Sequence, residues 1–444
     1  MTDQDSHPQP ITTQLMPRVP GLLAGRPNTV DVLVRIQGPD ASPAMSRRTP
    51  LNLALVLDRS GSMGGRPLFE AIRCAHAMID RLRADDHAAL VVFDNKVDTL
   101  VDCRPMTDKF RFHAALDLID SGGSTNLHGG WLRGAELIAG QARADSVSRV
   151  LLLSDGQANQ GLLEQDAIAS QCAELAKASV TTSTYGLGRH FNEDLMDAMA
   201  LSGQWQAYYG ETADDLMAPF QQEFDLLEAL CAKSLRMTVA PEAGITEEVL
   251  NAYARVDSAY VLPNLAYESE VWALLRVQVP ASASGQGNGE RVRLAHVQLT
   301  AQDLQGRDCP LPGLILELPS LPPQAFGALA QDEPVGRRLA EIGAARLQEQ
   351  AMRAARGGHW QAVGALLDEA RREARDNPWV GGILDTLEKL AAMEDRMRFS
   401  KEARYSSRKL QSRMTSRGEA LDDSADWLHP SYLRRKREQG KGEP

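Results

Sequence analysis

The chain has 444 residues, of which 43% are hydrophobic and 24% charged, so it is long enough for about two to four domains with buried cores. Its net charge of −11 at pH 7 argues against general nucleic-acid binding, which needs a basic surface. Five cysteines, far apart and in no CxxC pair, argue against a disulfide framework or a structural zinc site.

The first residues, MTDQDSHPQPITTQ, lack the basic start and apolar run of a secretion signal. No later segment approaches the roughly 20 consecutive apolar residues that a membrane-spanning helix needs. We therefore expect a cytoplasmic protein without a membrane span.

Residues 1–47 contain one alternating apolar and polar run, Thr29–Gln37, that predicts a half-buried strand before a Pro- and Ser-containing linker. From residue 48 to 233, short apolar runs alternate with helical periodicity, which predicts a doubly wound α/β domain with a mostly parallel sheet. The predicted strands are 51–57, 88–93, 97–103, 149–154, 180–186 and 206–209, and the predicted helices are 67–82, 108–119, 127–142, 164–178, 193–201 and 213 to about 233. A short turn joins the second strand to the third, so these two are expected to be antiparallel, with the later one at the sheet edge.

Residues 234–320 change to alternating strands, which predicts a β-sandwich. The Thr29–Gln37 strand has no place in the α/β sheet, so we expect it to cross the linker and join that sandwich. Residues 333–400 are rich in Ala, Arg, Glu and Leu, which predicts a helical domain of three helices with breaks at Gly357-Gly358 and Asn377-Pro378. Residues 401–444 are predicted to form a basic, flexible tail.

Side chains with hard oxygen atoms follow the ends of the predicted parallel strands. Asp58, Ser60 and Ser62 form a DxSxS pattern after the strand 51–57, Thr125 lies in the loop GGSTN, and Asp155 follows the strand 149–154. In an open parallel sheet, ligands bind outside the carboxyl ends of the strands. We therefore expect these five side chains to come together.

This combination resembles the metal-ion-dependent adhesion site of von Willebrand factor A domains, whose pattern is DxSxS, then a Thr, then an Asp. The resemblance extends to GLGRHFNEDLMDAMA and YYGETADDLMAPFQQEF, which are similar to the domain end in bacterial relatives of the calcium-activated chloride channel regulator type. It covers about two-fifths of the chain. It implies that Ser60 and Ser62 bind the metal through their hydroxyls and that Thr125 binds directly or through water. Asp58 and Asp155 would then lie nearby, largely bridged by water.

The resemblance implies Mg²⁺ as the ion, with Mn²⁺ or Ca²⁺ as possible substitutes, because Mg²⁺ prefers oxygen ligands and keeps some of its water. Neutral hydroxyl ligands leave the ion much of its positive charge, so an Asp or Glu of a partner protein can fill the open position. We expect a non-enzymatic scaffold or a signalling and assembly factor. The alternatives are an accessory subunit of an ATPase, kinase/phosphatase or channel-type system, or a metal-dependent hydrolase.

The histidines of the α/β domain offer weak support for an enzyme. None lies in a GxSxG elbow, and His76 and His113 are interpreted as structural histidines on two helices. His128 follows Thr125 and could shape a partner pocket or lie on the surface at a helix start; His87 and His190 complete the set. No GxxxxGK[ST] loop or strand–GxGxxG–helix unit predicts a nucleotide site.

The tail differs in charge from the rest of the chain. From Arg396 to Pro444 there are 13 Lys and Arg against 7 Asp and Glu, a local +6 that leaves −17 for the remainder. One hypothesis is that the acidic segment 422–426, followed by Trp427, presents a carboxylate to the metal site as a latch. The alternatives are that the segment folds against the helices, or that the basic tail is solvated or phosphorylated on its Ser and Thr residues.

Overall fold

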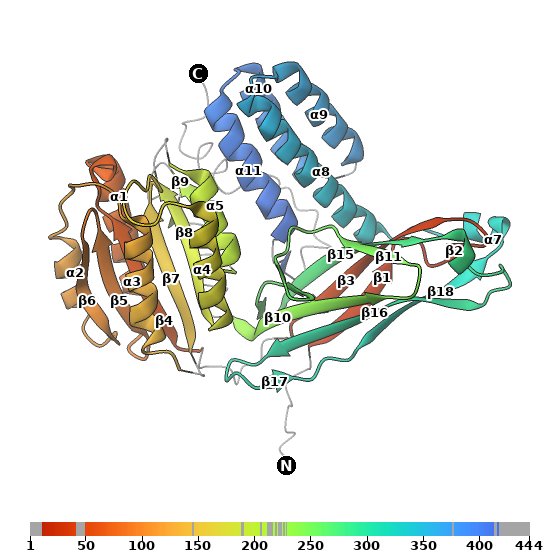
Figure 1. Cartoon of the computed structure of the whole chain (residues 1–444), viewed down its shortest axis with the longest axis horizontal. Helices are drawn as coiled ribbons and strands as arrows, with labels where there is room; N and C mark the ends of the chain where they lie inside the picture. The colour runs from red at the N-terminus through yellow and green to blue at the C-terminus, as the bar shows by residue number, and fades with distance from the viewer. Residues whose placement is uncertain are drawn as a thin grey trace, which may run out of the picture. The chain divides into compact units, whose positions relative to one another are not determined.

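The computed structural model describes most of the chain between residues 11 and 416 (Figure 1). The described residues are 11–40, 49–143, 146–187, 191–204, 207–210, 216–217, 220, 224, 227, 229–374, 377–412 and 415–416. They fall into two compact units, one formed by Met45–Leu230 with Asp303–Arg307, and one formed by the remaining segments. His190 and the acidic segment 422–426 with Trp427 lie outside the described residues.

The unit containing Met45–Leu230 is built on a six-stranded sheet in the order β6-β5-β4-β7-β8-β9 (Figure 1). Its strands are β4 (Leu51–Asp58), β5 (His87–Phe93), β6 (Val97–Pro105), β7 (Val147–Ser154), β8 (Val180–Leu187) and β9 (Ala207–Gly210). All neighbouring strands are parallel except β5 and β6, which are antiparallel, with β6 at the edge. The predicted α/β fold with a mostly parallel sheet is confirmed.

Helices cover both faces of this sheet, which explains why its strands are continuous apolar runs rather than alternating ones. The helices are α1 (Arg66–Arg81), α2 (Lys109–Leu116), α3 (Leu127–Ala139), α4 (Gln165–Lys177) and α5 (Glu193–Ser202), and a short 3₁₀ turn, η1 (Gly61–Met63), precedes α1. In β4, Leu53, Leu55 and Leu57 pack with the apolar residues of α1 and α2. Ala54 and Val56 pack instead with α3, α4 and α5.

The helix predicted from residue 213 to about 233 ends too late. Leu216, Phe220, Phe224 and Leu227 are buried at helical spacing in the α1 and α2 side of the core. From Leu230, however, the chain forms β10 (Leu230–Pro241), which pairs with β16 (Arg291–Gln302). The prediction was wrong at this end because strand pairing far along the chain decided the conformation of residues whose local sequence also suits a helix.

The other unit contains two mostly antiparallel sheets that enclose one apolar core, as the predicted sandwich requires. One sheet has the order β1-β3-β15-β11 with β19 beside β15, and the other has the order β12-β13-β10-β16-β18-β2 with β14 beside β10 and β17 beside β16. The strands not yet given are β1 (Thr12–Pro17), β2 (Leu22–Leu23), β3 (Asn28–Gln37), β11 (Thr246–Val249), β12 (Arg255–Val256), β13 (Ala259–Val261), β14 (Leu265–Ala266), β15 (Ser269–Val279), β17 (Asp308–Cys309), β18 (Leu314–Leu321) and β19 (Thr415–Ser416).

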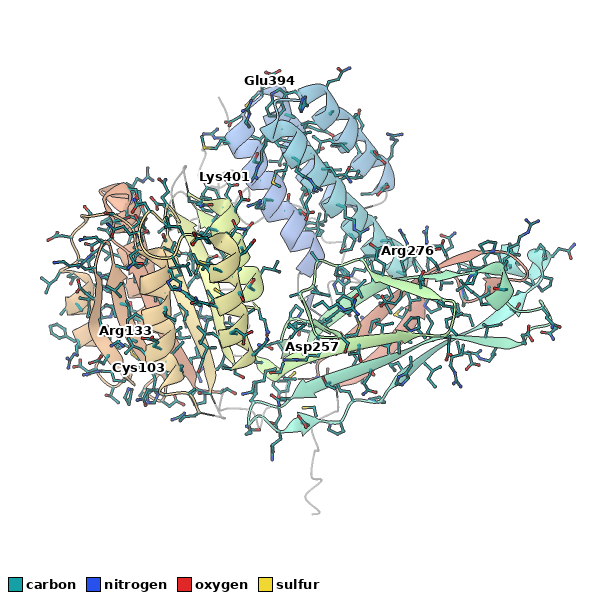
Figure 2. The ribbon with its side chains drawn as sticks, viewed as in Figure 1. Cys103, Arg133, Asp257, Arg276, Glu394 and Lys401 are labelled. Carbon is teal, nitrogen blue, oxygen red and sulfur yellow. The ribbon has the colours of Figure 1, made fainter. Side chains whose placement is uncertain are left out.

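Strand β3 lies in the middle of its sheet, between β1 and β15. It pairs with β15 from the Asn28–Val279 pair to the Gln37–Glu270 pair. Arg276 of β15, labelled in Figure 2, donates to both carboxylate oxygens of Asp31 in β3 at 2.8 and 3.3 Å. The segment from β1 to β3 is therefore an integral part of the sandwich, although the α/β domain is the next domain in the sequence.

The chain after the sandwich forms α7 (Pro323–Gly327), α8 (Glu333–Arg356), α9 (Trp360–Glu373), α10 (Pro378–Ala392) and α11 (Arg396–Ser412). Gly358, with φ of +75°, separates α8 from α9, and Asn377 caps α10 by accepting from the main-chain N–H of Val380. The flexible tail was predicted to start at residue 401, which is too early. Helix α11 continues to Ser412 and buries Ala403 and Leu410. The buried face of α11 was missed because its apolar residues are few and widely spaced.

The five cysteines form no disulfide, as the sequence predicts. Burial raises the pKa of the Cys103 thiol, labelled in Figure 2, to about 11 and that of Cys231 to about 12, so both remain protonated at neutral pH. None of the helices in the described part of the chain has the length and apolar character needed to cross a membrane.

Candidate metal centre

The predicted site lies where the order of the strands reverses. After β4 the chain moves outward to β5 and β6, and it then returns to β7 on the opposite side of β4. The carboxyl ends of β4 and β7 therefore flank the switch point at which open α/β sheets bind ligands. Asp58 is the last residue of β4 and Ser154 is the last residue of β7.

The carboxylate of Asp58 organises the DxSxS loop. One of its oxygens, Oδ1, accepts a hydrogen bond from the main-chain N–H of Ser60 at 2.8 Å. The other, Oδ2, accepts from the hydroxyl of Ser154 at 2.5 Å. The loop then turns so that the hydroxyl oxygens of Ser60 and Ser62 lie 3.1 Å apart. Two of the predicted hydroxyl ligands thus lie beside each other.

The loop that carries Thr125 is hydrogen-bonded to the DxSxS loop. The N–H of Gly61 donates to the carbonyl of Gly123 at 3.0 Å, and the N–H of Gly122 donates to the carbonyl of Arg59 at 2.8 Å. Gly123 has a φ of +75°, and a Cβ there would lie 2.4 Å from Oδ1 of Asn95, so this position requires glycine. Thr125 itself is buried, with 2% of its surface exposed.

The loop after β7 joins the other two. Oδ1 of Asn159 accepts from the N–H of Thr125 at 2.7 Å, and the carbonyl of Thr125 accepts from the N–H of Asn159 at 3.1 Å. Asp155 is nearly buried, its Oδ1 accepts from the N–H of Gln157 at 3.1 Å, and its carbonyl accepts from Asn192 at 2.7 Å. The fold therefore holds all three predicted pieces of the site against one another.

Two carboxylates at this site lie without a positively charged partner among the described residues. Asp58 is completely buried, and in the described part of the chain neither it nor Asp155 forms an ion pair with Lys or Arg. Burial raises the pKa of Asp58 to about 6; hydrogen bonds from Ser154 and Ser60 lower it, and the negative charge of Asp155 raises it. Buried negative charge is costly unless a cation compensates it, so these residues fit a bound metal ion.

The donor set favours a hard cation. Within the described ranges, no cluster of three or more His, Cys, Asp or Glu side chains is placed to hold a metal ion. An ion at the switch point would therefore depend on the Ser and Thr hydroxyls together with the two carboxylates. Hydroxyl, carboxylate and water oxygens are the ligands of Mg²⁺, whereas Zn²⁺ sites are built from Cys and His.

The buried charge of Asp58 predicts a measurable cost in the metal-free protein. A carboxyl whose pKa rises on folding stabilises the fold while it is protonated, and this contribution is lost as the pH rises from about 3.8 to about 6. At pH 7 in EDTA, Asp58→Asn should therefore raise the free energy of unfolding by up to about 3 kcal/mol, measured by urea denaturation.

The exposed Asp102 provides the control, because Asp102→Asn should leave the free energy of unfolding unchanged. Excess Mg²⁺ should stabilise the wild-type protein and not the Asp58→Asn variant. The difference between their free energies of unfolding should therefore shrink or change sign. A wild-type protein as stable in EDTA as Asp58→Asn would contradict the unfavourable burial of this charge.

Three residues that support the site were not predicted as part of it. Ser154 holds Asp58, Asn159 holds Thr125, and the side chain of Arg59 forms ion pairs with Asp94, at 3.1 Å, and with Asp98. The position of Ser154 immediately before a predicted site residue was a usable signal. The roles of Asn159 and Arg59 depend on loop conformations that a single sequence does not encode in a recognisable pattern.

His128 is not directed to the metal centre. Its Nε2 atom lies 2.8 Å from Oε1 of Gln171, and its ring lies beside that of Trp131 in α3. The sequence left two interpretations of His128, a residue that shapes a partner pocket and a surface residue at a helix start. These contacts favour the second interpretation.

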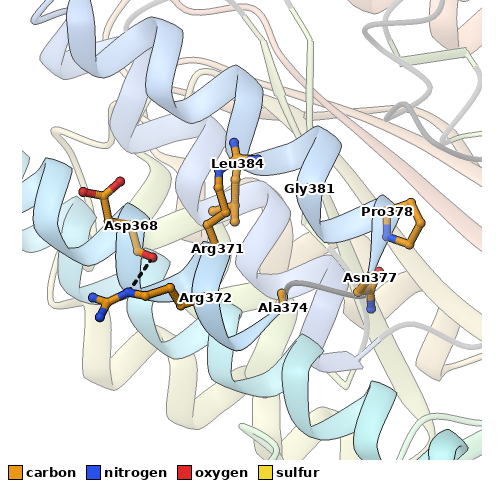
Figure 3. A pocket seen from close by; sticks show the side chains of 8 residues that line it. All are labelled: Asp368, Arg371, Arg372, Ala374, Asn377, Pro378, Gly381 and Leu384. Carbon is orange, nitrogen blue, oxygen red and sulfur yellow. Dashed lines mark hydrogen bonds between the residues drawn. The ribbon is translucent and has the colours of Figure 1, made fainter.

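A second candidate is a hollow of about 690 Å³ between α9 and α10 (Figure 3). It is lined by Asp368, Arg371, Arg372, Ala374, Asn377, Pro378, Gly381 and Leu384. Arg371 donates to Asp385 at 2.6 Å and to Glu388 at 2.9 Å, and Arg372 donates to the carbonyl of Asp368 at 3.3 Å. Because Arg371 is paired within the helices, the hollow is a weaker candidate for a charged ligand than the switch point.

The fold and the arrangement at the switch point agree with the comparison to known families. Residues 52–222 match the von Willebrand factor type A domain. The chain therefore contains a von Willebrand factor type A (VWA) domain, a class of α/β domain that commonly mediates protein–protein interactions.

Curated relatives share this region. An uncharacterized protein of Synechocystis sp. is 31% identical over 199 residues, which cover 44% of this chain and 47% of that protein. The uncharacterized protein YfbK of Escherichia coli is 27% identical over 216 residues, 47% of this chain and 36% of that protein. The human inter-alpha-trypsin inhibitor heavy chain H3 is 26% identical over 200 residues, 39% of this chain and 22% of that protein. The matched segments span about half or less of each relative.

Two solved structures are similar over most of the chain. A von Willebrand factor type A protein from Catenulispora acidiphila has a TM-score of 0.68 at 16% identity and covers 86% of this chain and 90% of its own. The ArnB paralog VWA2 from Sulfolobus acidocaldarius has a TM-score of 0.58 at 17% identity and covers 91% and 99%. These likenesses extend the shared fold beyond the VWA domain to the additional sheets and helices.

Proposed function

We propose that this chain is a non-enzymatic interaction protein whose VWA domain binds Mg²⁺ and, through it, an Asp or Glu of a partner protein. One observation carries the proposal. Two buried carboxylates, which pair with no Lys or Arg among the residues that the structure describes, lie with paired hydroxyls in the loops at the switch point of the sheet. Mn²⁺ or Ca²⁺ would be substitutes in vitro.

Each residue has a distinct part in this proposal. Ser60, Ser62 and Thr125 would hold the ion through neutral hydroxyl oxygens, while Asp58 and Asp155 would compensate its charge, largely through water. Ser154 and the Ser60 N–H fix the direction of the Asp58 carboxylate through hydrogen bonds to its two oxygens. A bound ion supplies a positive centre with an open coordination position, which attracts a carboxylate from outside.

The remaining domains would act as a scaffold for the VWA domain, in a signalling or assembly role beside an ATPase or a kinase/phosphatase system. We place the protein in the cytoplasm, supported by five thiols that form no disulfide. A metal-dependent hydrolase is less well supported. In the described part of the chain, the Nδ1 atoms of His76 and His113 face each other at 2.6 Å and Nε2 of His128 lies 2.8 Å from Oε1 of Gln171, so none of these three rings is aimed at the switch point.

The test is capture of a partner by the full chain in excess Mg²⁺ and in EDTA, with wild-type protein and Asp155→Ala. A partner specific to this site should be retained by the wild-type protein in Mg²⁺ and lost in EDTA and in Asp155→Ala. Replacing single Asp or Glu residues of that partner by Ala should reduce its affinity at least about tenfold at one position. A partner that binds equally in Mg²⁺ and EDTA would contradict the proposed mechanism.

A further inference from the structure

Helix α1 carries the pattern HAxxD as HAMID at residues 76–80, and α2 together with its C-cap residue Asp117 carries it as HAALD at residues 113–117. In each, an Asp follows a His by four residues, a spacing that places both side chains on one face of a helix. The structure joins the two patterns crosswise. Nε2 of His76 lies 3.1 Å from Oδ1 of Asp117, and Nε2 of His113 lies 3.1 Å from Oδ1 of Asp80.

The remaining ring nitrogens of the two histidines face each other. Nδ1 of His76 lies 2.6 Å from Nδ1 of His113. The rings are inclined by only 8°, and their centres are 4.9 Å apart. The centre-to-centre distance exceeds the Nδ1–Nδ1 distance by about the diameter of one imidazole ring. The rings therefore lie nearly edge to edge, and both Nδ1 atoms lie close to the line between their centres.

This arrangement needs a positive charge between the rings. An aspartate carboxylate only accepts hydrogen bonds, so each Nε2 must carry the hydrogen that it donates to its Asp. In a neutral imidazole, the other nitrogen then carries a lone pair. Two neutral rings would thus direct lone pairs at each other at 2.6 Å, which is repulsive. A shared proton or a metal ion relieves that repulsion.

We propose that His76 and His113 form a second metal site, for a transition-metal ion of the Zn²⁺ class, bound by the two Nδ1 atoms. Imidazole nitrogen suits Zn²⁺, Cu²⁺ and Ni²⁺, whereas the oxygen atoms of the switch point suit Mg²⁺. The pair of aspartates supports a metal rather than a proton alone. Metal-bound histidines commonly donate their other N–H to a carboxylate, which fixes the ring and strengthens the ligand.

The surroundings leave room for an ion to enter. The side chains of His76 and His113 are 28% and 26% exposed, and those of Asp117 and Asp80 are 68% exposed. Two Zn–N bonds of about 2.0–2.1 Å at a tetrahedral angle need nitrogens about 3.3–3.4 Å apart, so the rings must separate by roughly 0.7 Å. Both rings must also tilt, so that their Nδ1 lone pairs turn from facing each other toward one ion beside the line that joins them. Rotation of partly exposed side chains accommodates that shift.

The site would be open rather than closed. In the described part of the chain, no third His, Cys, Asp or Glu joins the pair in a geometry for metal binding, so water or an incoming ligand would complete the coordination. Lys109 brings a positive charge nearby, but its ammonium group donates to the main-chain carbonyl of Asp80 and leaves the carboxylate to His113. Open coordination of this kind gives an exchangeable ion.

The experiment measures Zn²⁺ binding to the full chain by equilibrium dialysis in excess Mg²⁺. The wild-type protein is compared with His76→Gln, His113→Gln and the matched control His128→Gln, whose histidine is bonded to Gln171. Both pair variants should lose about one Zn²⁺ per chain, while His128→Gln should not. Asp117→Asn should weaken the same site by about 10–100-fold because it removes the carboxylate that orients His76.

Two further measurements keep the result decisive. Circular dichroism melting shows that the variants are folded, and ring ¹⁵N spectra of the wild-type protein show whether the Nδ1 signals of His76 and His113 shift on addition of Zn²⁺. Repeating the dialysis with Asp155→Ala separates this site from the switch point. This variant should bind Zn²⁺ at the histidine pair as the wild-type protein does. Equal Zn²⁺ binding by all histidine variants, or Nδ1 signals unmoved by Zn²⁺, would mean that the pair holds a shared proton only.

Discussion

Replacing Asp155 by Ala is expected to reduce the affinity of the chain for Mg²⁺ by about 10–100-fold while leaving it folded. Asp155 lies in the loop beyond β7, and among the described residues its side chain accepts one hydrogen bond, from the main-chain N–H of Gln157 at 3.1 Å. Its removal therefore takes away negative charge at the switch point without opening a cavity in the apolar core. Isothermal titration calorimetry with Mg²⁺ measures the affinity.

Ser60→Ala should have the same direction of effect, because it removes one of the two paired hydroxyl oxygens. The matched control is Asp102→Ala, because Asp102 is an exposed acidic residue of the same domain. This variant should bind Mg²⁺ like the wild-type protein. A folded Asp155→Ala protein that retained wild-type Mg²⁺ affinity would rule out the switch point as the metal site.

Deletion of residues up to Gly38 is expected to unfold the sandwich and leave the VWA domain folded. It removes β1, β2 and β3, and with them the neighbour of β15 on one side and the buried residues Val32, Val34 and Ile36. Each fully buried side chain of this size contributes about 1.5–3 kcal/mol, so their sum approaches the about 5–15 kcal/mol that stabilises a typical domain. Hydrogen exchange followed by mass spectrometry should show lost protection in β15 and β16, and retained protection in β4.

A pair of single substitutions tests the same point in the full-length chain. Val34→Asp places a charge in the sandwich core and should destabilise it severely, whereas Thr29→Asp, at an exposed position of the same strand, should have little effect. Lost protection in β4 with an intact sandwich, in either the deletion or Val34→Asp, would contradict the assignment of this strand.

Much of the α/β domain could be predicted because its signals are local. The apolar run at 51–57 needs two covered faces, and the helical spacing of Leu68, Ile72 and Ile79 fits the helix that covers one of them. The residues of the candidate metal centre could be predicted from the sequence for a related reason. Because ligands bind at the carboxyl ends of parallel strands, the residues directly after β4 and β7 could be selected from the sequence alone.

The sequence by itself determined the types and approximate bounds of most strands and helices, and the oxygen-bearing residues at the strand ends. The tertiary structure decided which distant segments meet: it extended β10 back to Leu230 through pairing with β16 and placed Asn159 under Thr125. It also brought the Nδ1 atoms of His76 and His113 to within 2.6 Å of each other, although in the sequence each histidine was interpreted as a structural residue of its own helix. The physical reason is that periodicity and propensity act within a few residues along the chain, whereas strand pairing and side-chain contacts depend on groups that the sequence separates and only the packed core brings together.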